Sequence, residues 1–332
     1  MQKKISFFFL SIFLINTLAC SLENKKMFKK TKFLMDTVVT ITVISNSEQE
    51  ANIAIDKAFL EIEKIEKLTN IFSKNSEINN LNRYAGLKRL KVSDTLYNII
   101  ELSLNISQMT QGAFDITIGS ITSLYDYYKK IKPDEDTIKK RLKLVNYKDI
   151  ILDKNNKTVF LKNKGMTIDL GGIAKGYAAD KAVESLKENN IKSGLVAIAG
   201  DIKSFGLKPN NKPWKIGIRD PRSKNKEDLL TAIDLTDMSI STSGNYERFF
   251  ISEGKRYHHI ISPFTGLPAS ECQSVTIIAK DCYLTDSLAT GIFVIGPKNG
   301  LKLLEDMGYE GIIIDKDGKL FITQGLKKKL EL

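Results

Sequence analysis

Histidine and cysteine are scarce in this chain of 332 residues, which contains two histidines and three cysteines. No closely spaced cysteine pair occurs, so the sequence disfavours a structural zinc site. Cys272 and Cys282 could be joined in an oxidising compartment, and their spacing neither demands nor forbids a disulfide. We expect two separate buried thiols. Only seven prolines occur and no Ser/Gly-rich linker appears, so the sequence has no clean domain boundary.

Signatures of nucleic-acid binding are also missing, although the formal net charge is +11. A basic chain favours anionic partners in general. Here the lysines are dispersed, and the densest run is Lys327 to Lys329 at the C-terminal end. We interpret the charge mainly as a solvated surface. No recognition helix, zinc finger or aromatic RNA-binding motif accompanies it, so we expect no nucleic-acid partner.

An apolar run from Ile5 to Ala19 follows two lysines near the N-terminus. It is shorter than the roughly 20 residues needed to span a bilayer, and it has the length of a secretory signal. It ends in Thr17-Leu18-Ala19-Cys20, which resembles a bacterial lipoprotein signal, although Thr17 stands where Leu is usual. A plain signal peptide or an uncleaved anchor is the alternative.

We therefore predict a signal peptide over residues 1–19, lipidation of Cys20 and a tether over residues 20–32. One domain would follow over residues 33–332. The protein would be exported and anchored by lipid to the membrane, on the periplasmic side of the inner membrane.

The apolar spacing predicts helices first and strands later. We expect a strand over 37–44 and helices over 47–70, 94–110 and 137–144. After residue 150 we expect extended segments over 150–161, 195–198, 214–218, 231–235, 257–261 and 274–278, with one helix over 174–189. Helices over 286–295 and 298–307 and a hairpin over 311–322 end the chain. This order favours an α+β fold over a regular βαβ array.

The segment from Asp169 to Gly176 combines a strand end, two glycines and a helix start. Glycines allow a sharp turn and the close approach of a ligand, and the free N–H groups of a helix start suit phosphate. Lys175 would add a positive charge in the first turn, and Asp169 could hold a ligand's donors. The alternative is an ordinary strand–helix turn that contains a tight glycine.

Asp286 and Thr290 are four residues apart in a predicted helix. This spacing puts both side chains on one face, with Cβ atoms about 5–6 Å apart. A carboxylate and a hydroxyl are hard oxygen ligands that suit Mg²⁺ or Ca²⁺. Alternatively, Asp286 caps the helix and Thr290 belongs to the core.

His258 and His259 are the only histidines, and in a strand they would face opposite sides. The one that faces a cleft is the best candidate for a general base, because imidazole titrates near neutral pH. The other could be a structural, hydrogen-bonded histidine. Ala113, Phe114 and Asp115 follow a predicted helix and could line a pocket, or form a loop with a core phenylalanine.

The order of these segments is more specific than any one of them. It resembles the ApbE family of FAD:protein FMN transferases over nearly all of the chain after the tether. The matching segments are Met35-Asp36-Thr37, Ser76-Glu77-Ile78 with Leu81-Asn82, Phe114-Asp115-Ile116-Thr117, Asp169 to Gly176, Ala199-Gly200-Asp201, Ser241-Thr242-Ser243-Gly244, His259 to Pro263 with Thr265-Gly266, and Asp286 to Thr290.

The resemblance implies a mixed α+β fold with antiparallel sheets, flanking helices, a core likened to the tunnelling fold and a cleft for FAD. It also implies a reaction in which Mg²⁺ assists cleavage of the FAD pyrophosphate, AMP leaves, and FMN is joined to a Thr or Ser hydroxyl of an acceptor protein. Some members pass FMN to water and act as FAD pyrophosphatases. A flavin-binding lipoprotein without catalysis is a third possibility.

Carried onto this sequence, the resemblance implies roles for individual residues. Asp286 and Thr290 would bind Mg²⁺ through their side chains and Gly172 through its carbonyl. His259 would be the general base. The FAD site would be lined by Met35, Phe72, Ala113, Phe114, Asp115, Asp169 and Lys175. Two departures stand out, because Asp36 replaces a frequent glycine and Ser262 replaces a frequent aspartate.

Overall fold

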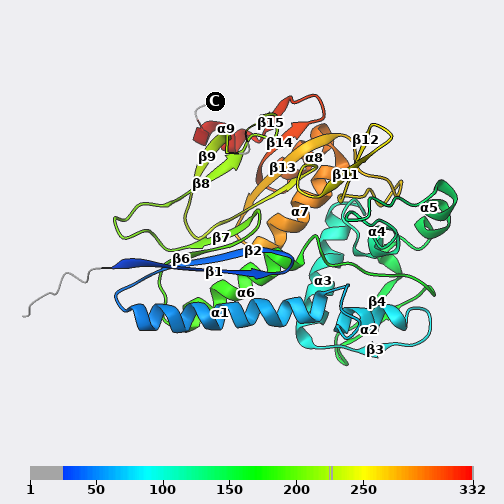
Figure 1. The fold of residues 1–332 in the computed structure, drawn as a ribbon, viewed down its shortest axis with the longest axis horizontal. Helices are drawn as coiled ribbons and strands as arrows, with labels where there is room; N and C mark the ends of the chain where they lie inside the picture. Colours follow the sequence, from blue (N-terminus) through cyan, green and yellow to red (C-terminus); the bar gives the residue numbers. More distant parts are fainter. Residues whose placement is uncertain (1–24, 224, 226, 331–332) are drawn as a thin grey trace, which may run out of the picture.

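One long antiparallel sheet forms the frame of the protein (Figure 1). The computed structural model describes residues 25–223, 225 and 227–330. The eight strands lie in the order β1 (Lys26–Leu34), β2 (Thr37–Ser45), β6 (Gly194–Ile198), β7 (Asp201–Phe205), β10 (Ser239–Gly244), β13 (Cys272–Ala279), β14 (Glu310–Asp315) and β15 (Leu320–Ile322). The sheet stays open, and each pair of neighbours is antiparallel. The α+β prediction is confirmed.

Three small sheets lie outside this frame. They are formed by β3 (Leu90–Lys91), β5 (Thr158–Leu161) and β4 (Ile150–Asp153), by β8 (Trp214–Arg219) and β9 (Leu229–Leu235), and by β11 (Phe249–Ser252) and β12 (Lys255–His258). Short 3₁₀ helices lie between α3 and α4 (η1, Ile116–Ile118) and between α5 and β4 (η2, Tyr147–Asp149).

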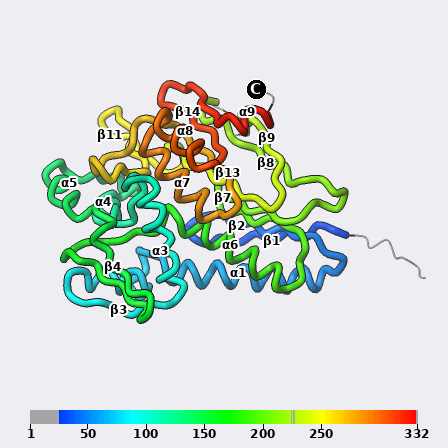
Figure 2. The backbone as a smooth tube through the Cα atoms, turned by 180° about the vertical axis from the view of Figure 1, so that it is seen from behind, coloured from blue at the N-terminus to red at the C-terminus, as the bar shows by residue number. Residues whose placement is uncertain are grey.

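Long helices cover one face of the sheet, as both views show (Figures 1 and 2). They are α1 (Glu48–Thr69), α6 (Ala174–Glu188), α7 (Cys282–Ile295) and α8 (Pro297–Asp306), while α3 (Asp94–Met109) packs against α1 and α7. The short helices are α2 (Glu77–Arg83), α4 (Gly119–Thr122), α5 (Glu135–Leu142) and α9 (Gln324–Leu330). None of the helices described is long and apolar enough to cross a membrane.

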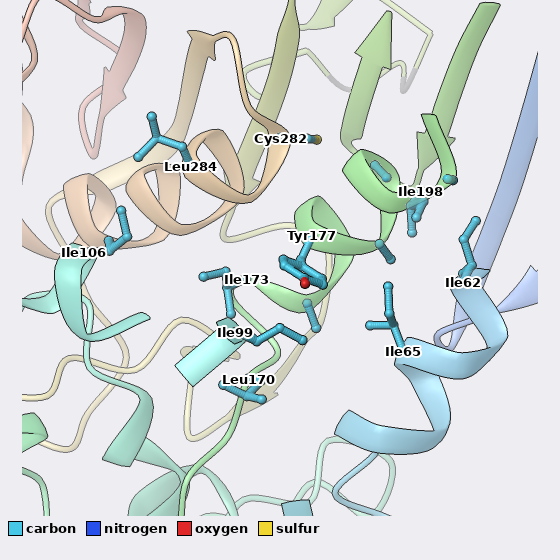
Figure 3. Close-up of a cluster of buried hydrophobic side chains, with 14 of the residues drawn as sticks. Ile62, Ile65, Ile99, Ile106, Leu170, Ile173, Tyr177, Ile198, Cys282 and Leu284 are labelled. Atoms are coloured by element: carbon cyan, nitrogen blue, oxygen red, sulfur yellow. The ribbon is translucent and has the colours of Figure 1, made fainter. Parts of the chain in front are cut away.

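The main core lies where α6 packs between α1 and α7. Figure 3 shows Ile173 and Tyr177 from the start of α6 among side chains of α1, α3 and α7. These side chains are buried, with Ile173 at 0% exposure. Apolar packing therefore holds the start of α6 and the preceding turn, Gly171-Gly172, in one position. Lys175, in the first turn of α6, is held in place with them.

Most of the predicted elements form within a few residues of their expected bounds. Strand β2 buries Val39, Ile41 and Val43, as its period of two predicts. Helix α1 begins after Ser47, whose side chain accepts a hydrogen bond from the N–H of Glu50. Ile53 is an exception to the expected apolar face, because it is 49% exposed.

Four boundaries differ from the predictions. Residues 150–161 form the hairpin of β4 and β5 rather than one extended segment, and the strand expected over 257–261 ends at His258. Helix α7 begins four residues earlier than expected, at Cys282. The predicted tether over 20–32 is wrong for residues 26–32, because they belong to β1, which pairs with β2 along its whole length.

Two predictions lie outside the described residues. They are the signal peptide over residues 1–19 and the lipidation of Cys20. By contrast, the expectation of two separate thiols is confirmed, since Cys272 and Cys282 are both free and buried.

Candidate active site

A buried cluster of opposite charges lies at the start of α6. The Nζ of Lys175 is 2.9 Å from a carboxylate oxygen of Asp201 and 3.2 Å from one of Asp286. Both carboxylates have side chains only 5% exposed. Two buried carboxylates thus share one ammonium group, which leaves the cluster with a net charge of −1 and able to attract a further cation.

The pKa values of Asp286 and Lys175 are both shifted by their surroundings in the cluster. Burial and, after it, the nearby charge of Asp201 together raise the pKa of Asp286 to about 6, against the opposing effect of Lys175. Burial alone would lower the pKa of Lys175, but the attraction of the two carboxylates outweighs it and raises the pKa. Lys175 therefore stays charged at neutral pH.

Asp286 is held in place by close packing of α6 on α7. The backbone N–H of Gly176 donates to the Oδ2 of Asp286 at 3.0 Å. A methyl group on Gly176 would lie 2.6 Å from the carbonyl carbon of Cys282 and 2.8 Å from the Cβ of Asp286. The glycine is thus required for the two helices to approach closely enough for this bond.

Helix α7 begins early because a side chain from another helix caps it. The carboxylate of Asp180, on α6, accepts hydrogen bonds from the N–H groups of Cys282 and Tyr283 at 3.0 and 2.9 Å. Lys203 balances its charge at 2.9 Å. Asp286 consequently lies in the second turn of α7 and does not cap it, which excludes the capping alternative for this residue.

The residues expected to bind metal lie together. Thr290 Oγ1 lies 3.3 Å from the backbone oxygen of Asp286 and 3.3 Å from the Oγ of Ser243. A methyl group on Gly172 would lie 3.4 Å from that same Oγ1 and 3.1 Å from the ring of Phe114. Gly172, Thr290 and Asp286 therefore surround one small region.

This donor set fits a hard divalent cation. Carboxylate, hydroxyl and carbonyl oxygens are the ligands that Mg²⁺ and Ca²⁺ prefer, and the charge of the Lys175 cluster favours a cation. Among residues 25–330, apart from the two undescribed positions, no three histidine, cysteine or carboxylate side chains gather as a metal-binding group. The ligands expected here are one carboxylate (Asp286), one hydroxyl (Thr290) and one backbone carbonyl (Gly172), so they would not form a group of that kind.

Asp115 and Asp169 both stabilise turns beside this region. Asp115 is buried and accepts bonds from the N–H and hydroxyl of Thr117 and from the N–H of Tyr147, at 2.8, 2.6 and 2.8 Å. Asp169 accepts from the N–H of Gly171 at 2.9 Å and from the hydroxyl of Thr122 at 3.0 Å. In both residues each carboxylate oxygen accepts at least one of these bonds, and Asp169, which is half-buried, is more accessible than Asp115.

The remaining residues expected at the FAD site differ in exposure. Ala113 and Phe114 are buried, and the ring of Phe114 contacts the glycine turn. Met35 lies half-buried in the turn between β1 and β2. Phe72 is 81% exposed in the segment between α1 and α2, so the structure does not bring its ring into the cluster. Contact of these side chains with FAD stays a prediction.

His258 is the structural histidine. Its Nε2 donates to the carbonyl of Ala269 at 2.8 Å, and its Nδ1 accepts from the N–H of Ile260 at 3.3 Å. Its ring is buried and meets the ring of Phe293 edge-on. Both nitrogens are occupied within the protein, so this imidazole has no lone pair free for a substrate.

His259 is the histidine with a free nitrogen. Its Nδ1 lies 3.3 Å from the carbonyl oxygen of Arg248, and a carbonyl only accepts, so Nδ1 carries the proton and Nε2 has an open lone pair. The pKa of His259 is lowered, chiefly by desolvation among the surrounding residues and further by the charges of His258, Arg248 and Lys175. His259 is nonetheless an exposed residue, so solvent limits this lowering. A neutral, accessible imidazole near Lys175 suits a general base.

A comparison with known proteins identifies the family. The model of the ApbE family matches residues 35–313. The chain belongs to this family. A Treponema pallidum protein named FAD:protein FMN transferase is 31% identical over 323 residues, covering 92% of this chain and 89% of its own length. A Klebsiella pneumoniae protein of the same name is 29% identical and covers 91% of this chain and 93% of its own length.

Solved ApbE structures share the fold. The ApbE protein of Thermotoga maritima superposes with a TM-score of 0.85 at 31% identity, covering 91% of this chain and 99% of its own. The flavin transferase ApbE of Vibrio cholerae gives a TM-score of 0.81 at 26% identity and covers 92% of this chain and 99% of its own. The resemblance found in the ordered motifs is therefore confirmed.

Some residues of this ApbE site carried no role in the sequence interpretation. Asp201 and Ser243 were recognised only as parts of motifs, yet Asp201 pairs with Lys175 and Ser243 contacts Thr290. Asp180 and Arg248 gave no signal of their own. Asp201 lies two residues after Ala199, whose φ of 51° only the structure reveals, so the sequence alone gave no clue to this pairing.

Proposed function

We propose that this chain transfers FMN from FAD to an acceptor protein and releases AMP. The observation that carries the proposal is the pairing of an oxygen-donor cluster, Asp286, Thr290 and Gly172, with a neutral histidine whose Nε2 is free. The family membership and the names of the relatives support the same reaction.

The finer proposal includes Mg²⁺ held by the side chains of Asp286 and Thr290 and the carbonyl of Gly172. Bound there, Mg²⁺ would neutralise charge on the pyrophosphate of FAD. The N–H groups at the start of α6, which has no side-chain cap, would donate to the phosphate oxygens. Lys175 would add a positive charge at the same point, so the protein itself stabilises the charge that develops as AMP departs.

The acceptor would be a Thr or Ser hydroxyl of a partner protein. His259 would take its proton through Nε2 while the hydroxyl oxygen attacks the phosphorus of the FMN half. The bond from that phosphorus to the bridging oxygen breaks, and AMP leaves with the electron pair. The contact of Nδ1 with the carbonyl of Arg248 would keep the imidazole in the tautomer that this step requires.

The location of the enzyme also belongs to the proposal. The signal-like residues 1–19 and Cys20 support export and attachment by lipid to the periplasmic side of the inner membrane. The segment between Cys20 and β1, which begins at Lys26, would then be a short link to the bilayer.

The test uses the full chain, purified in detergent, with FAD and Mg²⁺, in the presence or absence of a candidate acceptor protein. AMP, free FMN and flavin fluorescence of the acceptor on a denaturing gel are followed. We expect AMP matched by protein-bound flavin, dependent on Mg²⁺. Asp286→Asn and His259→Ala should each lower transfer by a factor of about 100 or more.

Asp306 is an exposed aspartate on α8 that pairs with Lys302 and with no other described residue. Asp306→Asn is the matched control and should leave transfer unchanged. Free FMN that appears in step with AMP without an acceptor would favour an FAD pyrophosphatase. Stoichiometric flavin binding without AMP would favour a carrier lipoprotein and refute catalysis.

A further inference from the structure

The turn between β1 and β2 has an unusual residue for its geometry. Leu34 pairs with Thr37, so the turn consists of Met35 and Asp36 alone. Both have positive φ, 53° and 58°. Two-residue turns of this kind favour glycine, because an L side chain in the left-handed region is unfavourable. The aspartate that replaces the frequent glycine of the family tolerates this region better than most residues do, and its side chain can make a contact that glycine cannot.

The structure supplies a partner for this aspartate. The Oδ2 of Asp36 lies 2.7 Å from the Nη2 of Arg248, which is 212 residues away in the sequence. Both side chains are about half exposed, at 48% and 44%. Among the described residues, Asp36 is the one hydrogen-bond partner of the guanidinium. This contact joins the turn that carries Met35 to the segment just before β11.

Arg248 also holds His259, through its backbone. Its carbonyl oxygen accepts from the backbone N–H of His259 at 3.1 Å and from the Nδ1 at 3.3 Å. One residue thus bonds the β1–β2 turn with its side chain and fixes the imidazole with its carbonyl. A movement of Arg248 would loosen the bond that determines which nitrogen of His259 carries the proton.

We propose that Asp36 and Arg248 are positioning residues, whose ion pair fixes the Arg248 carbonyl and so keeps the Nε2 of His259 unprotonated and directed to the acceptor. The inference rests on the role of His259 in the proposed function. The competing interpretation is an ordinary surface ion pair that has no effect on His259. Neither residue touches the reacting atoms, so the effect must be transmitted through the carbonyl.

The variants are Asp36→Asn, Arg248→Gln and the double variant in the full-length protein. Asparagine tolerates the left-handed region as well as aspartate does, so Asp36→Asn removes the charge without adding backbone strain. A half-exposed ion pair is weak, and we expect kcat for FMN transfer to fall about two- to fivefold with little change in KM for FAD. The double variant should lose no more than the worse single variant.

A spectroscopic readout separates positioning from general damage. With only two histidines, the ¹⁵N signals of the imidazoles can be assigned directly. In the wild type, His259 should show the Nδ1–H tautomer and His258 the Nε2–H tautomer. In Asp36→Asn and Arg248→Gln, the His259 signals should shift towards a mixture of tautomers, while those of His258 stay unchanged.

Asp306→Asn provides the matched loss of an exposed ion pair, 2.6 Å long, and should change neither kcat nor the tautomers. If Asp36→Asn leaves both the His259 signals and kcat as in the wild type, the positioning role is wrong. If His259→Ala retains full transfer, the failure lies with the proposed base instead.

Discussion

Gly176→Ala tests the close contact between α6 and α7 on which the site depends. The added methyl would lie 2.6 Å from the carbonyl carbon of Cys282 and 2.8 Å from the Cβ of Asp286. Carbon atoms in contact normally lie about 3.5–4.0 Å apart. The two helices would therefore have to separate by roughly 1 Å. That movement would also lengthen the 3.0 Å bond from the Gly176 N–H to the carboxylate of Asp286.

The energetic effect can be estimated from these contacts. Overpacking costs about 1–3 kcal/mol, and weakening a hydrogen bond to a charged group costs about 1.5–3 kcal/mol. Alanine is better than glycine in a helix by about 1 kcal/mol, which offsets part of the loss. The net destabilisation is about 3 kcal/mol. Because unfolding about 300 residues has a large entropy, we expect the melting temperature to fall by roughly 5 °C.

Thermal unfolding followed by circular dichroism measures this effect. Gly325→Ala in α9 is the comparison variant, because the three atoms nearest to the added methyl all belong to the side chain of Glu310, which can turn aside by giving up its bond with the Thr323 hydroxyl. It should leave the melting temperature within about 2 °C or raise it slightly. A Gly176→Ala protein that melts no lower than the Gly325→Ala protein would refute the packing argument.

Two further predictions concern titratable groups. Because the pKa of His259 is lowered, its base form persists as pH falls through the usual value of about 6.5, so kcat for transfer should stay level there and decline only at lower pH. A pH profile with an acidic limb at 6.5 or above would contradict the lowered pKa. Burial raises the pKa of the Cys272 thiol to about 12 and that of Cys282 well above its ordinary value. Neither thiol should therefore be alkylated by iodoacetamide at pH 8 in the folded protein, as mass spectrometry of peptides would show; modification before unfolding would contradict their burial.

Periodicity in the sequence was sufficient for elements whose packing is decided locally. The alternation in β2 and the helical spacing in α1 reflect one buried face each, and the structure forms both within a residue of the prediction. The spacing of Asp286 and Thr290 similarly predicted that both side chains lie on one helical face. The face on which a side chain lies depends only on its position along one helix or strand, so the spacing of residues in the sequence is enough to predict it.

Boundaries set by other elements could not be read from the chain. Helix α7 begins at Cys282 because Asp180 of α6 caps it, and residues 26–32 form a strand because β2 offers them an unpaired edge. The turn that splits residues 150–161 into β4 and β5 contains Lys157, at a positive φ of 50° that its residue type does not announce.

The sequence by itself determined the order of the motifs and the residue types of the site. These two features were enough to indicate the family to which the chain belongs. The tertiary structure decided which groups act together. Lys175 meets Asp201 and Asp286 across 26 and 111 residues, and Arg248 joins Asp36 to His259 across the sheet frame. Such contacts depend on how α6, α7 and the hairpins pack, since charge and tautomer respond to distance in space and not to distance along the chain.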